Sequence, residues 1–251
     1  MSENVTHPRN LDTQEGRAFP ATRWSLVLQA RLPDQPKAHR ALEELCRQYW
    51  FPIYAFLRRE GYARHDAQDL TQSFFADVLR EDTLQKSAPE RGRLRTFLLA
   101  SLKRHLIDHA RQQNAQKRGG RETVISLDDL QAEERLAEEP AHQESPDRLF
   151  ERAWARDVFD RSRAKLRENY TSRGKTNLFE SLEECLGWND KETSYRSLAA
   201  RLSLGEPAVR LQVFRLRQKY RELLEAEVAD TVASPEELNQ ELAWLAGALR
   251  A

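Results

Sequence analysis

A long helical repeat of apolar residues, between positions 93 and 116, limits the fold of this chain more than any other feature. Apolar side chains recur there at steps of three and four residues, at Leu94, Phe97, Leu98, Leu102 and Leu106. This spacing places them on one side of an α-helix. Other segments repeat the pattern, glycine and proline are sparse, and the 32% of charged residues is typical of exposed helical surfaces. We therefore expect an all-α protein.

The expected helices fall into two groups, which predicts two helical domains joined by an acidic linker. Ten acidic residues against two basic ones between positions 122 and 151 give this stretch a formal charge of −8. It holds few large apolar residues, so we expect the linker not to fold alone. The predicted division is a disordered N-terminus at 1–18, a helix bundle at 19–120, the linker at 121–146, a second domain at 147–232 and an extension helix at 233–251.

The helix expected between positions 66 and 80 has an apolar stripe on one side and a polar face on the other. The stripe consists of Ala67, Leu70, Phe74 and Val78. The polar side carries Asp66, Asp69, Gln72 and Asp77. Two carboxylates in the first turn also suit the helix dipole. We interpret this polar side as a protein-docking face.

Positive charge gathers in the helix that follows and in the segments beside it. Positions 91 to 121 hold nine Lys or Arg residues and one acid, a formal charge of +8. Such a segment attracts nucleic acid by counterion release. The alternative is that the acidic linker neutralises it within the same molecule, and charge alone leaves both open. His105 and His109 stand one helical turn apart beside Asp108, but His105 falls on the apolar stripe, so we expect no metal site.

Two helices joined by a tight connection near the C-terminal end, at 195–202 and from Glu206 onward, form a helix-turn-helix pattern. The second helix has a formal charge of +4 between positions 206 and 221. Its first residues would face the DNA major groove: Glu206, Ala208 and Arg210. Arg215 and Arg217 would bind phosphates. The alternative is a hairpin packed for structure, with a solvated basic face.

Several classes of protein do not fit this sequence. It has no glycine-rich phosphate loop, no nucleophile with its base and only two cysteines, so we expect neither an enzyme nor a cofactor. Since the first sixteen residues hold no apolar core and no window approaches 18 apolar residues, we expect a cytoplasmic protein without a membrane partner.

Five motifs, in order along the chain, resemble bacterial extracytoplasmic-function (ECF) sigma factors. Residues 66–75 (DAQDLTQSFF) resemble the family's DAEDLTQEVF-like signature, residues 91–98 (RGRLRTFL) its RGSFRAWL entry to the promoter helix, and residues 107–111 (IDHAR) its IDxxR. Residues 195–202 (YRSLAARL) and 209–217 (VRLQVFRLR) are similar to its helix-turn-helix. The match covers about 20–232, and residues 22–27 and 220–232 resemble a subgroup with a long linker and a C-terminal extension.

The resemblance implies an RNA polymerase sigma factor, with core RNA polymerase and promoter DNA as partners. The sequence leaves open whether an anti-sigma factor is a further partner. Core polymerase would bind Asp66, Asp69, Gln72 and Phe75. The −10 element would be read and opened by residues around the basic helix: Arg93, Arg95, Lys103, Arg104, Arg111, Lys117 and Arg118. The −35 element would be read by Glu206, Ala208, Arg210, Arg215 and Arg217. The linker would enter the polymerase channels, where its charge mimics nucleic acid.

Two positions depart from the family pattern: Arg104 replaces an asparagine, and Ser203 replaces the glycine of the turn. A left-handed serine costs on the order of 1 kcal/mol, so we expect a turn that differs in detail. Two other functions remain as alternatives: a dimeric helix-turn-helix regulator that binds duplex DNA without polymerase, and a helical scaffold that binds no DNA.

Overall fold

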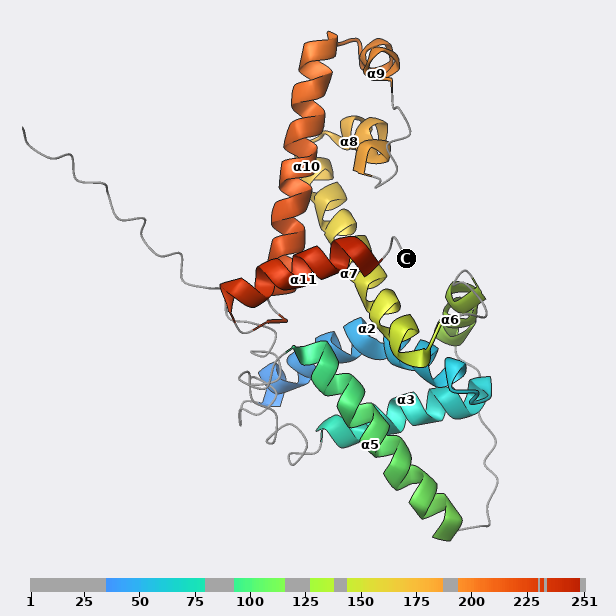
Figure 1. Cartoon of the computed structure of the whole chain (residues 1–251). Helices are drawn as coiled ribbons and strands as arrows, with labels where there is room; N and C mark the ends of the chain where they lie inside the picture. Colours follow the sequence, from blue (N-terminus) through green and yellow to red (C-terminus); the bar gives the residue numbers. More distant parts are fainter. Residues whose placement is uncertain are drawn as a thin grey trace, which may run out of the picture.

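The computed structural model describes residues 35–79, 93–115, 127–137, 144–186, 194–229, 231–232 and 234–248. Every regular element in these ranges is a helix, which confirms the all-α prediction (Figure 1). The elements are α2 (Gln35–Arg59), α3 (Arg64–Leu79), α5 (Leu94–Ala115), α6 (Leu127–Ala137), α7 (Pro146–Thr171), α8 (Thr176–Leu182), the 3₁₀ turn η2 (Glu183–Leu186), α9 (Tyr195–Leu202), α10 (Glu206–Ala229) and α11 (Pro235–Ala248). The predicted disordered N-terminus lies outside the described residues.

The long helix α7 holds the molecule together, because it packs against α2 at one end and α10 at the other. Its start is set by Ser145, whose hydroxyl accepts a hydrogen bond from the N–H of Arg148, and by Pro146 in the first turn, as the sequence predicts. Phe150 and Trp154 are fully buried in a core cluster that continues from α2 to α10. Two domains joined by a linker are therefore not confirmed.

A helix, α6, lies within the predicted linker and packs against α2 and α7. Both Nε and Nη2 of Arg58 donate to the carboxylate of Glu133, at 2.8 and 3.2 Å. Arg135 forms an ion pair with Asp157 of α7, and its guanidinium lies 3.7 Å from the centroid of the Phe51 ring. The acidic segment thus gains structure from ion pairs with other helices, which its own composition does not predict.

At the other end of α7, the helices α8, α9 and α10 form the C-terminal part of the bundle. Tyr220 donates to the carbonyl of Phe159 at 3.2 Å, and the buried Glu227 forms ion pairs with Arg161 and Lys165, which together hold α10 on α7. Helix α11 then packs against both α10 and α7. As a result, α9 and the start of α10 lie at one end of the molecule and the C-terminal end of α5 at the other (Figure 1).

Candidate nucleic-acid and polymerase interfaces

The polar face of α3 is exposed as predicted. Ala67, Leu70, Phe74 and Val78 are buried, and this leaves Asp66, Asp69 and Gln72 on the solvent side. Asp69 Oδ2 lies 3.8 Å from His65 Nε2, an exposed pair one turn apart. A partner with basic side chains could therefore reach these carboxylates without rearranging the helix.

Phe75 does not belong to this face, which corrects its assignment as a docking residue. Only 5% of its surface is exposed, and its ring lies 5.6 Å from that of Phe74 in a tilted arrangement. The reason is the width of the apolar stripe, which on this helix includes two adjacent aromatic residues. Phe75 therefore packs beneath the exposed face of α3.

The outer side of α5 carries three of the predicted DNA-binding residues. Lys103 Nζ lies 2.7 Å from Asp147 of α7, Arg104 donates to its own helix at Ala100, and Arg111 pairs with Asp108 at 3.4 Å. All three basic side chains are largely exposed, so these contacts are easily exchanged for phosphates. Lys117 and Arg118 lie outside the described residues.

An exposed isoleucine, which the sequence analysis did not single out, lies on the same side of α5. Ile107 is 53% exposed and stands one turn from Lys103 and from Arg111. Its position outside the apolar stripe is visible in the sequence spacing. A large apolar side chain between cations suits a surface that contacts both bases and phosphates.

Arg93 and Arg95 at the start of α5 are less accessible than the basic residues on the outer side of this helix. Arg95 is 3% exposed, and its guanidinium donates to Glu241 at 2.6 and 3.1 Å and to Glu151 at 2.6 Å. Arg93 Nε lies 2.9 Å from Glu241. The prediction that Arg95 is an open DNA contact is therefore wrong for this conformation, and Arg93 is only partly accessible. The cause is a carboxylate that comes from α11, far along the chain.

The middle of α5 is attached to α3 through His105. His105 Nδ1 lies 2.8 Å from Asp77, and Nε2 lies 3.1 Å from the hydroxyl of Ser73. Burial lowers the pKa of His105, although Asp77 opposes that shift. The described residues contain no group of three or more metal-binding side chains. His105 thus positions α5 on α3 and leaves the outer side of α5 free.

The helix-turn-helix has the expected connection. Ser194 accepts from the N–H of Ser197 at the start of α9. At its end, Ser203 adopts the left-handed conformation with φ 53° and ψ 40°, so the serine that replaces the family's glycine keeps the turn at some cost. This geometry brings the start of α10 to the surface next to α9.

The start of α10 presents most of the predicted −35 residues. Glu206, Arg210 and Arg215 are exposed, whereas Ala208 is half-buried. The guanidinium of Arg210 lies 5.0 Å from the centroid of the Tyr195 ring, and this cation–π contact orients it. Arg217 is exposed, but its Nε donates to the carbonyl of Cys185 at 3.0 Å, which fixes its stem against the turn η2.

Two large apolar residues next to these arginines were missed by the sequence analysis. Leu211 is 47% exposed and Phe214 is 64% exposed, although their spacing resembles that of core residues. Val213 and Leu216 fill the buried stripe, so Leu211 and Phe214 must point outward. The start of α10 is thus a mixed cationic and apolar surface.

Comparison with known proteins places the chain in a family. The family model described as "ECF sigma factor" matches residues 55–184, from the end of α2 into η2. The chain belongs to the ECF sigma factor family. No curated protein and no solved structure matches it. It is therefore an RNA polymerase sigma factor that acts in transcription initiation, with core RNA polymerase and promoter DNA as its partners.

Two further points concern this sigma factor. The family is not a class of enzymes. Within the described ranges, no helix combines the length and the apolar character that crossing a bilayer requires. The family match ends before α9, so the helix-turn-helix and α11 depend on the structure alone for their interpretation.

Proposed function

We propose that this sigma factor divides its work among three surfaces. The polar face of α3, with Asp66, Asp69 and Gln72, binds core polymerase. The outer side of α5, with Lys103, Arg104 and Arg111, contacts the −10 element together with Lys117 and Arg118. The start of α10 reads the −35 element. The protein would do this in the cytoplasm, where polymerase and chromosome meet.

One observation carries the proposal: exposed cations gather on two helix surfaces that lie at opposite ends of the molecule. Arg210 and Arg215 project from the second helix of a helix-turn-helix, which is the element that enters the major groove in such units. Lys103, Arg104 and Arg111 project from α5, and Ile107 supplies an apolar contact for unstacked bases. Two separate cationic surfaces suit a protein that contacts one promoter at two places.

A run-off transcription assay with core polymerase and genomic fragments of the host tests this function. The wild-type protein should start transcripts at defined positions, and core polymerase alone should not. Absence of any defined start would contradict the proposal. Tight binding of the isolated protein to duplex DNA, without polymerase, would instead favour a stand-alone helix-turn-helix regulator.

Asp69→Arg tests the docking face in the same system. A reversed charge facing basic partner groups should weaken core polymerase binding on the order of 100-fold, while the fold persists because Asp69 is exposed. Asp160→Arg is the matched control, since it reverses an exposed carboxylate on α7. Co-purification of the Asp69→Arg protein with core polymerase at the wild-type level would refute the assignment.

A further inference from the structure

Four charged side chains and two tryptophans meet where α5 begins, beside α7 and α11. We call this group the Glu241 cluster: Arg93, Arg95, Glu151, Trp154, Glu241 and Trp244. Glu241 is fully buried, accepts hydrogen bonds from Arg95 and forms an ion pair with Arg93. The guanidinium of Arg95 lies 3.9 Å from the Trp244 ring centroid and 5.3 Å from that of Trp154. The C-terminal helix α11 thus binds two arginines at the start of α5, the helix proposed to bind DNA: Arg93 just before the helix and Arg95 in its first turn.

The arginines provide the chemistry of a phosphate site. The guanidinium of Arg95 holds Glu241 with two parallel hydrogen bonds, the geometry with which arginine also binds phosphate. The start of α5 adds the positive end of a helix dipole. The backbone N–H of Leu94 there donates to the carbonyl of Thr231, at 3.3 Å. The carboxylate of Glu241 and the carbonyl of Thr231 therefore accept the hydrogen bonds that phosphate oxygens of a DNA backbone would otherwise accept.

We propose that Glu241 is an internal phosphate mimic, and that α11 occupies in the free protein a DNA-backbone site formed by Arg93, Arg95 and the start of α5. Promoter DNA displaces α11 when the transcription complex forms. This inference depends on the proposed DNA-binding role of α5. It adds a regulated site to that surface, because the two arginines bind DNA only after the C-terminal helix has left.

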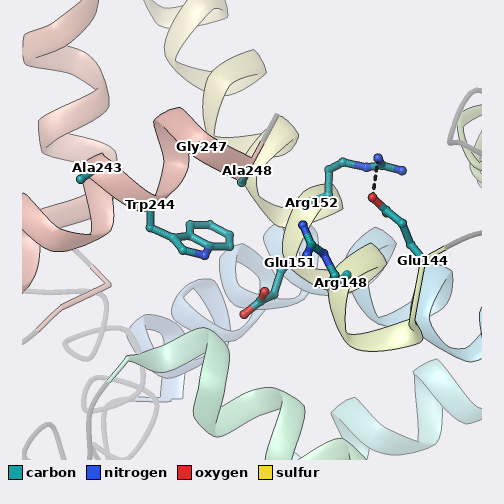
Figure 2. Close-up of a pocket in the computed structure, with 8 residues that line it drawn as sticks. All are labelled: Glu144, Arg148, Glu151, Arg152, Ala243, Trp244, Gly247 and Ala248. Atoms are coloured by element: carbon teal, nitrogen blue, oxygen red, sulfur yellow. Dashed lines mark hydrogen bonds and ion pairs between the residues drawn. The ribbon is translucent and has the colours of Figure 1, made fainter. Parts of the chain in front are cut away.

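The contact between α11 and α7 is not packed along its whole length. A cavity of about 340 Å³ separates the two helices beside the cluster, lined by Glu144, Arg148, Glu151, Arg152, Ala243, Trp244, Gly247 and Ala248 (Figure 2). The α11 side of it consists of small residues apart from Trp244, and a side-chain carbon added at Gly247 would meet nothing within 4 Å. An interface with unfilled space loses few packing contacts when it opens.

The charges of the Glu241 cluster also permit the release of α11, provided that Glu241 separates from both arginines in one step. Removing one partner from a buried ion pair leaves the other charge buried and unpaired. When α11 departs as a whole, Glu241 returns to water and Arg93 and Arg95 meet phosphate instead. Exchange of one anion for another therefore avoids the cost that a single substitution would impose.

The salt dependence of DNA binding tests the proposal in the full-length protein without polymerase. The probe is a fluorescein-labelled oligothymidine strand, followed by fluorescence anisotropy over a series of NaCl concentrations. Glu241→Gln should bind it more tightly than the wild type. Because two more phosphates are neutralised, the slope of log K against log salt should steepen by about 1.4. Adding Arg93→Ala to Glu241→Gln should remove about half of that change.

Two control variants separate release of α11 from other effects. Glu236→Gln removes the same charge from an exposed position of α11 and should leave the slope unchanged. Glu227→Gln removes one charge from another buried glutamate, which forms ion pairs with Arg161 and Lys165 and so holds α10 on α7. An unchanged slope in folded Glu241→Gln, or an equal increase in Glu227→Gln, would overturn the proposal.

A distance measurement on the otherwise unaltered chain covers the case in which Glu241→Gln fails to fold. Spin labels at Thr96→Cys on α5 and Ala243→Cys on α11 report the separation of the two helices. Burial raises the pKa of the Cys46 thiol to about 11 and Cys185 is buried, so both native thiols react slowly with the label. Saturating oligothymidine should lengthen and broaden the measured distance. An unchanged distance at saturation would show that α11 stays bound to α5 and would overturn the proposal.

These tests are independent of the transcription assay. A protein that supports transcription but shows no release of α11 would refute only the inference. A protein that releases α11 on DNA yet starts no transcript would contradict the proposed function in transcription initiation and leave the displacement of α11 by a DNA backbone intact.

Discussion

The arginines at the start of α10 and those at the start of α5 have the same chemistry and opposite surroundings. Arg210 and Arg215 are exposed, and Arg210 is oriented by the face of Tyr195. Arg95 is buried between two tryptophans and binds two glutamates, while Arg93 shares one of these. The first pair is accessible to a DNA partner, whereas the second pair already binds a carboxylate of the same protein, that of Glu241.

Positive charge in a local stretch of sequence therefore does not show whether a cationic side chain is accessible to a partner. The partner of Arg95 lies 146 positions away along the chain, in a helix beyond the helix-turn-helix. A count of charges over any short window misses that contact. In this sigma factor, α11 occupies Arg93 and Arg95, which a count of local charge would include among the accessible cations.

The largest expected effect comes from Arg95→Ala, which removes the central cation of the Glu241 cluster. Glu241 would stay buried with only Arg93 as a partner, so the free energy of unfolding should fall by about 3–5 kcal/mol. Urea denaturation measures it. Arg104→Ala, which removes an exposed arginine from the same helix, should stay within about 0.5 kcal/mol of the wild type. Similar small losses in both variants would show that the two regions do not differ.

The next effect concerns the open arginines. Arg210→Ala should cost about 1–3 kcal/mol of discrimination at one base position, if its guanidinium meets a guanine. Arg215→Ala should weaken all sequences alike, because Arg215 is predicted to contact phosphate. Run-off transcription from a set of single-base promoter variants, with core polymerase, measures both. A uniform loss for Arg210→Ala would make it a phosphate contact and remove the distinction between the two residues.

The smallest expected effect extends the comparison to the middle of α5, where His105 joins α3. Because burial lowers its pKa in the folded state, the unfolded chain takes up a proton first as the pH falls below about 6.5. The folded state therefore loses stability between that pH and its own lower pKa. Asp77, Asp108 and His109 also act on this ring, and Asp77 opposes the shift.

His105→Gln should remove this part of the pH dependence. Urea midpoints at about pH 7.5 and about pH 5.5 measure it, and the wild type should lose up to about 1 kcal/mol more than the variant. A wild type that gains stability relative to the variant on acidification would mean that Asp77 outweighs burial.

Local patterns predicted the helices and their ends well. The spacing of apolar residues identified α3 and α5 to within two residues. The left-handed residue at Ser203 was expected because Ser203 replaces the turn glycine of the family that the sequence resembles. These features depend on neighbours along the chain, which a sequence displays directly.

Long-range contacts account for what the sequence could not reveal. The helix α6 in the acidic segment binds Arg58, and Arg95 binds Glu241, and both contacts join residues far apart in the chain. Phe75 was misplaced because two adjacent aromatic residues can both be buried on a helix with a wide apolar side. The surfaces assigned to polymerase and to the two promoter elements remain predictions, supported by exposure and charge.

Chemical modification of arginines in the free protein tests the central contrast most directly. Phenylglyoxal reacts with accessible guanidinium groups, and mass spectrometry of the peptides reports the rate at each position. The account predicts that Arg210 and Arg215 react readily and that Arg95 reacts at least about tenfold more slowly, since its reaction needs an opening of the Glu241 cluster. Modification of Arg95 as fast as that of Arg210 would contradict it.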